Sequence, residues 1–275
     1  RDARLWNGVT AQQLMAFHPH GVVASASFSP DGKWLVTGSW DNSAKIWSTE
    51  TGQAEKKLEQ KHTGYVNTVR YSPQGNRIVT ASDDGTSKIW DAQSGEMLLS
   101  LDQPGTHVKS AVFSPDGKKV VTASDDKTLV MWDAQTGKKL STFKGHDWPV
   151  LEVAFSHDGT RLISGSEDNT AIIWDIATKE KKVLAGHTAS VESVVFSPDD
   201  TRAFTASDDG TAKLWDTKSG KEILTLSSHS QGVTSVDFSP DGRFVATGSQ
   251  DGQAILWLTV DWKDKAVARV VSRDP

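Results

Sequence analysis

The sequence contains no cysteine, which excludes disulfide bridges, thiolate metal ligands and a cysteine nucleophile. A chain without disulfides is compatible with a reducing cytoplasm, and we expect a cytoplasmic location. The sequence also has no uninterrupted run of the roughly 18 apolar residues that a membrane-spanning helix requires. We therefore expect no membrane-embedded segment.

A strong charge of either sign is missing as well. The 275 residues include 35 acidic and 30 basic side chains, so the formal net charge is only −5. Proteins that bind polyanions usually carry a clear basic excess. We expect no nucleic-acid partner and no anionic-membrane partner, and the slight acidity favours basic partners.

Tryptophan is abundant, with 11 residues, and it marks a repeat. In residues 205–216 a short apolar run, a polar turn with Gly210 and a second run ending at Trp215 are typical of a β-hairpin. Asp209 precedes Trp215 by six residues, and the same separation joins Asp41 to Trp47, Asp84 to Trp90, Asp126 to Trp132, Asp168 to Trp174, and Asp251 to Trp257. These tryptophans and Trp6 follow one another at intervals of 41 to 43 residues. This period is typical of four-stranded propeller blades.

The predicted fold class is all-β, a β-propeller of four-stranded antiparallel blades, with six complete blades and an incomplete seventh. In the fifth unit the four strands, named a to d, are expected at 191–196, 202–206, 212–215 and 222–226. Residues 1–17 supply only strands c and d of a partial blade, residues 18–271 form the six blades, and residues 272–275 are a tail. The last d strand is expected at 266–271.

The incomplete blade predicts that something else completes the fold. The aspartate expected six residues before Trp6 would fall at position zero, which indicates a module cut from a larger protein. The parent protein, a second copy or a bound strand could supply the missing strands a and b. A closed six-bladed ring with a spare hairpin is the alternative.

The turn between strands a and b repeats the residues Ser, Pro, Asp and Gly, as in 114–117 and 239–242. Proline suits the second turn position, and glycine accepts the left-handed conformation that returns the chain. Gln74 replaces the aspartate, His157 the proline and Asp200 the glycine. We expect the turn with Asp200 to be the most strained of the set.

Two recurring pairs indicate a family. Trp and Asp stand together at 90–91, 132–133, 174–175 and 215–216, and Gly and His precede strand a at 145–146 and 186–187. Over nearly its whole length the chain resembles the WD-repeat family of β-propellers. In that family each blade holds a hydrogen-bonded relay of His, Ser or Thr, Asp and Trp.

The resemblance assigns four complete relays by position. They are His62, Thr80, Asp84 and Trp90; His146, Ser164, Asp168 and Trp174; His187, Thr205, Asp209 and Trp215; and His229, Thr247, Asp251 and Trp257. The chemistry is consistent, because a buried indole N–H needs an acceptor, a hydroxyl accepts from it and donates to imidazole, and aspartate orients the ring.

Two blades depart from the relay. In the third blade Pro104 takes the histidine position and leaves Thr122, Asp126 and Trp132 without a ring. We expect this blade to be less rigid than the fifth, with faster amide exchange. In the first blade Pro19 stands between His18 and His20, either of which is a candidate to reach Asp41.

Sets of Ser or Thr, His and Asp also suggest a protease. Four separate copies, each paired with a tryptophan, are what a repeated structure requires and not what one active site requires. Of the eight histidines, the four outside the relays are spread over three repeats, with His18 and His20 in the first, His107 in the third and His157 in the fourth. We therefore expect no metal, no cofactor and no catalytic site.

The resemblance also implies a binding surface on the narrow face, which the d–a loops and b–c turns form. The residues just before the relay aspartates are Trp40, Asp83, Asp125, Glu167, Asp208 and Gln250. The positions three and five residues after the relay histidines include Tyr65, Asn67, His107, Lys109, Pro149 and Leu151, with Trp148 adjacent and Glu192 adding a carboxylate. Aromatic anchors among carboxylates favour a segment with Lys or Arg. The alternative is that these aspartates serve only the turns, in which aspartate is a favoured residue.

The predicted function is a non-catalytic scaffold for a protein or peptide, with salt-sensitive binding that Asp125→Lys weakens. One alternative is a sensory or autoinhibitory module of a multidomain signalling protein with a kinase or nucleotide-binding switch. A third is a propeller enzyme with a site in its channel.

Overall fold

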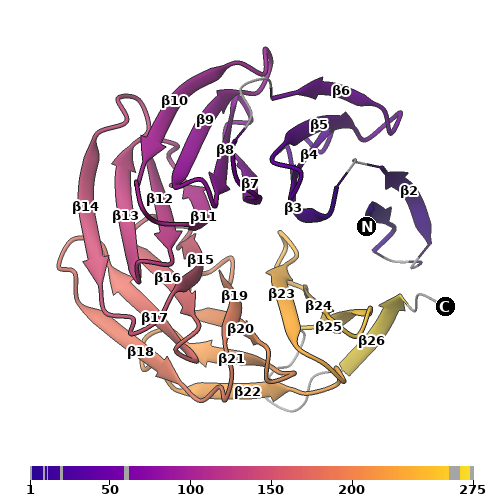
Figure 1. Ribbon diagram of the computed structural model, residues 1–275. Helices are drawn as coiled ribbons and strands as arrows, with labels where there is room; N and C mark the ends of the chain where they lie inside the picture. The colour runs from indigo at the N-terminus through magenta and orange to yellow at the C-terminus, as the bar shows by residue number, and fades with distance from the viewer. Residues whose placement is uncertain are drawn as a thin grey trace. The chain divides into compact units, whose positions relative to one another are not determined.

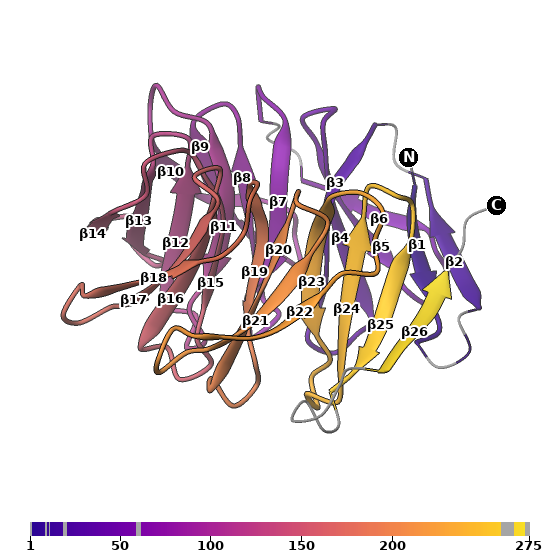
Figure 2. The same ribbon diagram turned by 90° about the horizontal axis from the view of Figure 1, so that it is seen from below.

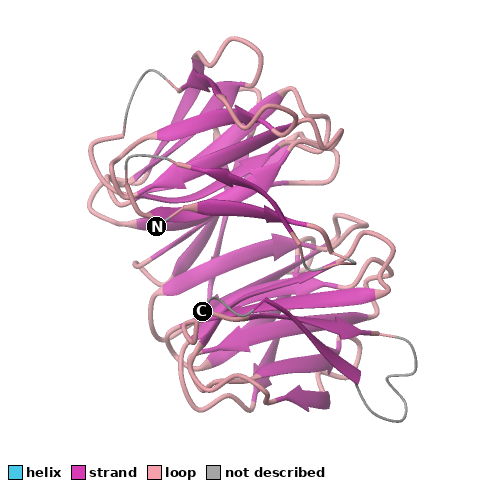
Figure 3. Cartoon of the chain, turned by 90° about the vertical axis from the view of Figure 1, so that its right-hand side faces the viewer, coloured by secondary structure: helices cyan, strands magenta, loops and turns pink. Residues whose placement is uncertain are grey.

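The computed structural model describes residues 2–8, 10, 12–18, 21–58, 62–259 and 267–272. Within these residues every regular element is a β-strand, as Figure 3 shows. No helix long and apolar enough to cross a membrane occurs in this part of the chain. The strands fall into two compact units, Arg1–Lys144 and Gly145–Pro275, which are described separately.

The first unit contains one two-stranded sheet and three four-stranded antiparallel blades (Figure 1). The two-stranded sheet pairs β1 (Ala3–Trp6) with β2 (Gln13–Phe17). The three blades are β3 (Val23–Phe28), β4 (Trp34–Ser39), β5 (Ala44–Ser48) and β6 (Ala54–Lys57); β7 (Val66–Tyr71), β8 (Arg77–Ser82), β9 (Thr86–Asp91) and β10 (Met97–Asp102); and β11 (Val108–Phe113), β12 (Lys119–Ser124), β13 (Thr128–Asp133) and β14 (Lys139–Lys144).

The second unit contains three more four-stranded antiparallel blades. They are β15 (Val150–Phe155), β16 (Arg161–Ser166), β17 (Thr170–Asp175) and β18 (Lys181–Ala185); β19 (Val191–Phe196), β20 (Arg202–Ser207), β21 (Ala212–Asp216) and β22 (Glu222–Leu226); and β23 (Val233–Phe238), β24 (Phe244–Ser249), β25 (Ala254–Leu258) and β26 (Val267–Ser272). Figure 2 shows β23 to β26 side by side in chain order.

The predicted fold class is confirmed, because the described residues form six complete blades and a hairpin in the place of strands c and d. In the fifth blade β19 and β22 have the expected bounds, and β20 and β21 each extend one residue further. The last strand, expected at 266–271, lies at Val267–Ser272, and Ala266 is outside the described residues.

The core of each unit lies between neighbouring blades. In the first unit Val79 and Ile89 of the second blade join Val108 and Phe113 of the third in one buried cluster. The second strand of a blade is buried on both faces, as the burial of Leu162 and Ile163 in β16 shows. This pattern is typical of repeat proteins, in which each repeat buries its apolar surface against its neighbours.

The edge of the two-stranded sheet is open within the described residues, where β1 pairs with β2 alone. Phe17 of β2 packs edge-on against Trp47 of the first blade, with ring centroids 5.8 Å apart. Among the described residues the Trp6 indole has no hydrogen-bond acceptor, although the tryptophans that end strand c in the six complete blades each have one.

Two departures from the repeated turn contact each other. Asp200 takes the place of glycine and adopts the left-handed conformation, with φ of 57°. Its carboxylate accepts hydrogen bonds from the backbone N–H groups of His157 and Asp158 at 2.8 and 2.9 Å, and lies 2.9 Å from His157 Nδ1. A proline at position 157 would have no N–H to donate. The strained turn of the fifth blade therefore bonds to the fourth blade.

We expect His157→Pro and Asp200→Gly, each of which restores the residue of the common turn, to be non-additive. A single change removes one partner and leaves the other unpaired, whereas the double change restores an ordinary turn. The summed losses of unfolding free energy in the single variants should exceed the loss in the double variant by about 1 kcal/mol. Urea unfolding measures this coupling, and strictly additive losses would contradict the contact.

Candidate functional site

The relay of the fifth blade is a continuous hydrogen-bonded chain from a buried indole to a carboxylate. Trp215 Nε1 donates to Thr205 Oγ1 at 2.8 Å, and that hydroxyl lies 2.7 Å from His187 Nε2. His187 Nδ1 lies 2.8 Å from Asp209 Oδ2. Because the hydroxyl accepts from the indole, its own proton points to Nε2, and the imidazole proton is on Nδ1. The ring is neutral and donates to the aspartate.

The structure brings together the other three predicted sets in the same way. Every contact is 2.7 to 3.0 Å long in the sets His62, Thr80, Asp84, Trp90; His146, Ser164, Asp168, Trp174; and His229, Thr247, Asp251, Trp257. The same aspartate oxygen, Oδ2, also accepts from the backbone N–H of the residue after each histidine, at 2.9 to 3.1 Å. Each relay therefore ties a d–a loop to a b–c turn.

The protonation of the relays follows from burial and hydrogen bonding. Burial lowers the pKa of His146 and of His187, against the opposing pull of Asp168 and Asp209. Burial alone would raise the pKa of Asp251, but hydrogen bonds from the backbone and from the His229 ring lower it to about 2. At neutral pH the relays of the fourth and fifth blades thus contain a neutral ring and an ionised carboxylate.

Burial also argues against a nucleophilic role for the relay hydroxyls. Thr80, Ser164 and Thr205 are 0% exposed. A nucleophile has to reach its substrate, and no external carbonyl can approach a hydroxyl enclosed on every side. The relays hold loops and turns in place.

The third blade replaces the missing histidine with a residue that the sequence reasoning overlooked. Gln103, buried beside Pro104, accepts a hydrogen bond from Thr122 Oγ1 at 2.5 Å and donates to Ser124 Oγ at 3.3 Å. Trp132 Nε1 donates to the same Thr122 hydroxyl at 3.0 Å. The blade does lack a ring, but its hydroxyl is satisfied, which removes the main reason to expect a looser blade. The only sequence signal was an amide side chain next to the proline.

The first blade has the indole contact, and no histidine among its described residues joins it. Trp47 Nε1 donates to Thr37 Oγ1 at 2.9 Å. His18, one of the two candidates to reach Asp41, instead lies 3.2 Å from an oxygen of Asp2 and is exposed. His20 and Pro19 lie outside the described residues. The carboxylate of Asp41 accepts from the backbone N–H and hydroxyl of Ser43.

Five of the predicted partner-binding residues of the first unit bond to one another. Asp83 accepts from Asn67 at 2.7 Å and from Lys109 at 2.8 Å, with His107 Nδ1 at 3.6 Å. Asp125 accepts from the backbone N–H of His107 at 2.8 Å. The Asp83 charge is therefore neutralised within the unit, and the Asp125 carboxylate serves its loop. The sequence pattern could not show this pairing.

Trp40 and Tyr65 form an exposed aromatic pair in the same unit. Their rings stack with centroids 5.6 Å apart and an interplanar angle of 23°. The two side chains remain 49% and 51% exposed. Stacked, half-exposed aromatic side chains supply apolar contact area with little loss of side-chain entropy on binding.

The second unit presents carboxylates without such pairing. Within its described residues no Lys, Arg or His lies within ion-pair distance of Glu167, Glu192 or Asp208; Asp208 accepts only from the Gln250 amide, at 3.1 Å. We call Glu167, Glu192 and Asp208 the acidic patch. Burial, followed by the charges of Asp208, Glu167 and Glu152, raises the pKa of Glu192 to about 7.

An aromatic side chain adjoins this acidic patch. Trp148 is 59% exposed, and its carbonyl accepts from Ser166 Oγ at 3.2 Å. Glu167, the residue after Ser166, donates its backbone N–H to the Pro149 carbonyl at 3.0 Å. The loop that carries Trp148 therefore lies directly beside the turn that carries Glu167, and half-buried Leu151 follows in β15.

The acidic patch does not have the composition of a metal site. In the part of the chain that the structure describes, no group of three or more His, Cys, Asp or Glu side chains could hold a metal ion. What the patch can supply is negative charge beside an exposed indole.

Comparison with known proteins identifies a family and a relative that is similar over a short segment. The family model described as "WD domain, G-beta repeat" matches six times, over residues 11–48, 54–91, 95–133, 137–175, 178–216 and 220–257. The "Periodic tryptophan protein 2 homolog" of Neurospora crassa is 46% identical over 48 residues, which are 17% of this chain and 5% of that protein. The match to this relative thus covers one repeat-length segment.

Replacing Gln103 with Leu should lower the free energy of unfolding by about 1 to 3 kcal/mol, because the buried Thr122 hydroxyl loses its closer acceptor and keeps the Val130 carbonyl at 3.3 Å. Gln135→Leu, in an exposed turn of the same blade, is the matched control and should change stability by less than about 0.5 kcal/mol. Chemical unfolding of both variants checks the assignment. Equal, small effects would show that Gln103 does not complete the network.

The raised pKa of Glu192 predicts a pH dependence with a definite sign. Its ordinary value is 4.5 and its folded value about 7, so the folded protein binds more protons between these values. Stability should therefore fall as pH rises through this window. At pH 8 Glu192→Gln should be more stable than wild type, on the order of 2 kcal/mol after screening by solvent.

Unfolding free energies measured from pH 4 to 8 test this, with Glu180→Gln, an exposed turn substitution, as control. If wild type and Glu192→Gln showed the same pH dependence of the unfolding free energy, the environment described for this carboxyl would be wrong.

Proposed function

The chain belongs to the WD-repeat family of β-propellers, and on that premise we propose that it is a non-catalytic scaffold whose second unit docks a basic segment of a partner protein. The proposed docking surface is the acidic patch together with Trp148. WD-repeat propellers generally bind proteins or peptides, which is the class of function that the family match supports.

The unpaired charge of the acidic patch carries this proposal. Burial, followed by the charges of the neighbouring carboxylates Asp208, Glu167 and Glu152, raises the pKa of Glu192. No cation of the described second unit lies within ion-pair distance of the acidic patch. A Lys or Arg side chain placed among these carboxylates would relieve their repulsion. Turn chemistry accounts for an aspartate such as Asp208, but Glu192 lies within strand β19 and serves no turn.

The indole beside the acidic patch favours an apolar residue next to the basic one. An exposed tryptophan at the edge of a charged surface is a common binding hot spot, because it combines large contact area with few rotatable bonds. The first unit suits a basic segment less well, since Lys109 already neutralises Asp83. Its Trp40 and Tyr65 pair offers apolar contact instead.

The docking proposal predicts salt-sensitive binding of a fluorescent Gly-Arg-Leu-Lys-Gly peptide and much weaker binding of its Glu-containing counterpart. Raising NaCl from about 50 to about 300 mM should weaken binding, because exposed charges are screened over shorter distances. Glu167→Lys should weaken it at least about tenfold, by placing a like charge where the peptide cation sits.

Glu180→Lys makes the same charge change in an exposed turn between β17 and β18 and should leave affinity within about twofold. Fluorescence anisotropy measures each of these affinities. Binding that is insensitive to salt and to Glu167→Lys would remove the acidic patch as the docking surface.

A further inference from the structure

Arginine side chains fill a slot between successive blades. One wall of the slot is the start of the second strand of a blade. The next blade forms the other wall with the end of its first strand, the turn that follows this strand, and the turn that follows its tryptophan. Between the second and third blades, Arg77 lies over the Phe113 ring, with 5.1 Å from guanidinium carbon to centroid. It donates to the Ala134 carbonyl at 2.9 Å and to the Gly117 carbonyl. An aromatic ring and two backbone carbonyls thus hold the guanidinium.

The fourth and fifth blades repeat this arrangement. Arg161 lies 5.3 Å from the Phe196 ring centroid and donates to the Asp200 carbonyl at 2.9 Å. The two occupied slots therefore share an aromatic platform and at least one carbonyl acceptor. Both features recognise a flat cation with several donors, which describes guanidinium better than ammonium.

The slot between the first and second blades has the same walls and no arginine. Trp34 stands at the position of Arg77, and the slot is a cavity of about 440 Å³. Tyr71 takes the place of Phe113, while Gly75 and Ala92 take the places of Gly117 and Ala134. Within residues 21–58 and 62–259 neither of these two carbonyls accepts a hydrogen bond, and both residues are half-buried.

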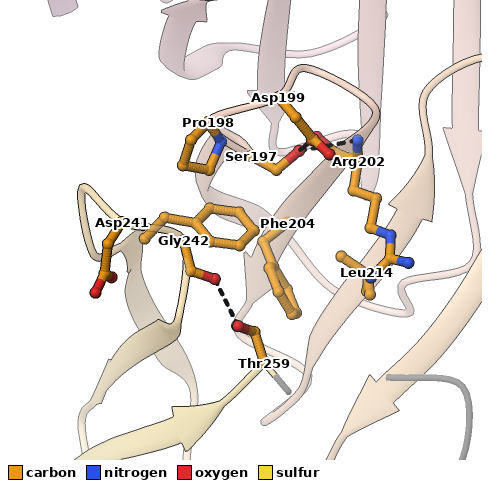
Figure 4. Close-up of a pocket in the computed structure, with 10 residues that line it drawn as sticks. Ser197, Pro198, Asp199, Arg202, Phe204, Leu214, Asp241, Gly242 and Thr259 are labelled. Carbon is orange, nitrogen blue, oxygen red and sulfur yellow. Dashed lines mark hydrogen bonds between the residues drawn. The ribbon is translucent and has the colours of Figure 1, made fainter. Parts of the chain in front are cut away.

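In three slots a threonine donates to the turn carbonyl, and one of these is the slot that also holds Arg161. Thr49, Thr217 and Thr259 donate to the carbonyls of Gly32, Asp200 and Gly242 at 2.8, 2.9 and 2.5 Å. Figure 4 shows the last of these slots, where Arg202 extends beside Leu214 and away from the Gly242 and Thr259 pair. Ala92 stands at the position of these threonines and has no hydroxyl. The slot beside Trp34 therefore has neither the arginine donor nor the threonine donor.

We propose that this vacant slot between the first two blades binds the guanidinium of an arginine side chain from a partner polypeptide. The guanidinium lies over the Tyr71 ring and donates to the Gly75 and Ala92 carbonyls, as Arg77 does one blade further on. The lining also includes the charged side chains Glu55, Lys56 and Asp91, so negative charge exceeds positive charge by one. The site lies on the first unit and is separate from the acidic patch.

The test uses the full chain and the probe acetyl-Gly-Arg-Gly-amide, with analogues that carry citrulline or lysine in place of arginine. Citrulline has the same shape but no charge and fewer donors. Calorimetric titration should show the arginine probe binding at least about tenfold more tightly than the citrulline probe and about threefold more tightly than the lysine probe.

Trp34→Arg supplies the missing guanidinium from within the chain and should weaken binding of the arginine probe at least about tenfold. Tyr71→Leu should weaken it about threefold or more, whereas Tyr71→Phe, which copies the occupied slots, should keep it. Glu180→Arg, in an exposed turn of the other unit, is the control and should leave binding unchanged, and binding should persist in Glu167→Lys, which disables the acidic patch. Loss of binding in Glu167→Lys would instead place the probe at the acidic patch.

Three results would overturn the proposal: no binding of the arginine probe by wild type, equal binding of the arginine and citrulline probes, or unchanged binding by a folded Trp34→Arg protein. The Tyr71 pair decides the question if Trp34→Arg fails to fold.

Discussion

The indole N–H at the end of each third strand has to find an acceptor inside the protein, because water cannot reach it. In the complete blades that acceptor is always a Ser or Thr hydroxyl on the neighbouring second strand, as Trp215 and Thr205 illustrate. The hydroxyl then needs an acceptor for its own proton, which imidazole provides in four blades and an amide provides in the third. The positions of the loops on the narrow face follow from this requirement.

Repetition made most of this predictable from the sequence. The six-residue spacing from aspartate to tryptophan recurs in every complete blade and identifies the hairpins. A histidine 22 residues before an aspartate identifies the relays, because the blade geometry is the same each time. Gln103 escaped notice because the family pattern asks for histidine one position later. An acceptor of different length can reach the same hydroxyl from a neighbouring backbone position, and sequence spacing does not reveal that reach.

Charge was harder to predict than fold. Asp83, Asp125, Glu167 and Asp208 occupy equivalent positions and read alike in the sequence. The structure separates them, since Lys109 and Asn67 reach Asp83 while no cation of the described second unit reaches Glu167. The Lys109 side chain reaches Asp83 from the next blade. Carboxylates at equivalent positions of a repeat therefore differ in whether a basic side chain of the neighbouring blade neutralises them.

The contact between His157 and Asp200 limits how independent the repeats are. Each residue breaks the turn pattern of its own blade, and each is accommodated by the other across 43 positions of sequence. Recombination or engineering that transplanted the fifth blade alone would carry a carboxylate in a left-handed turn without the donors that accommodate it. The fourth and fifth blades can therefore be grafted into another propeller only as a two-blade cassette.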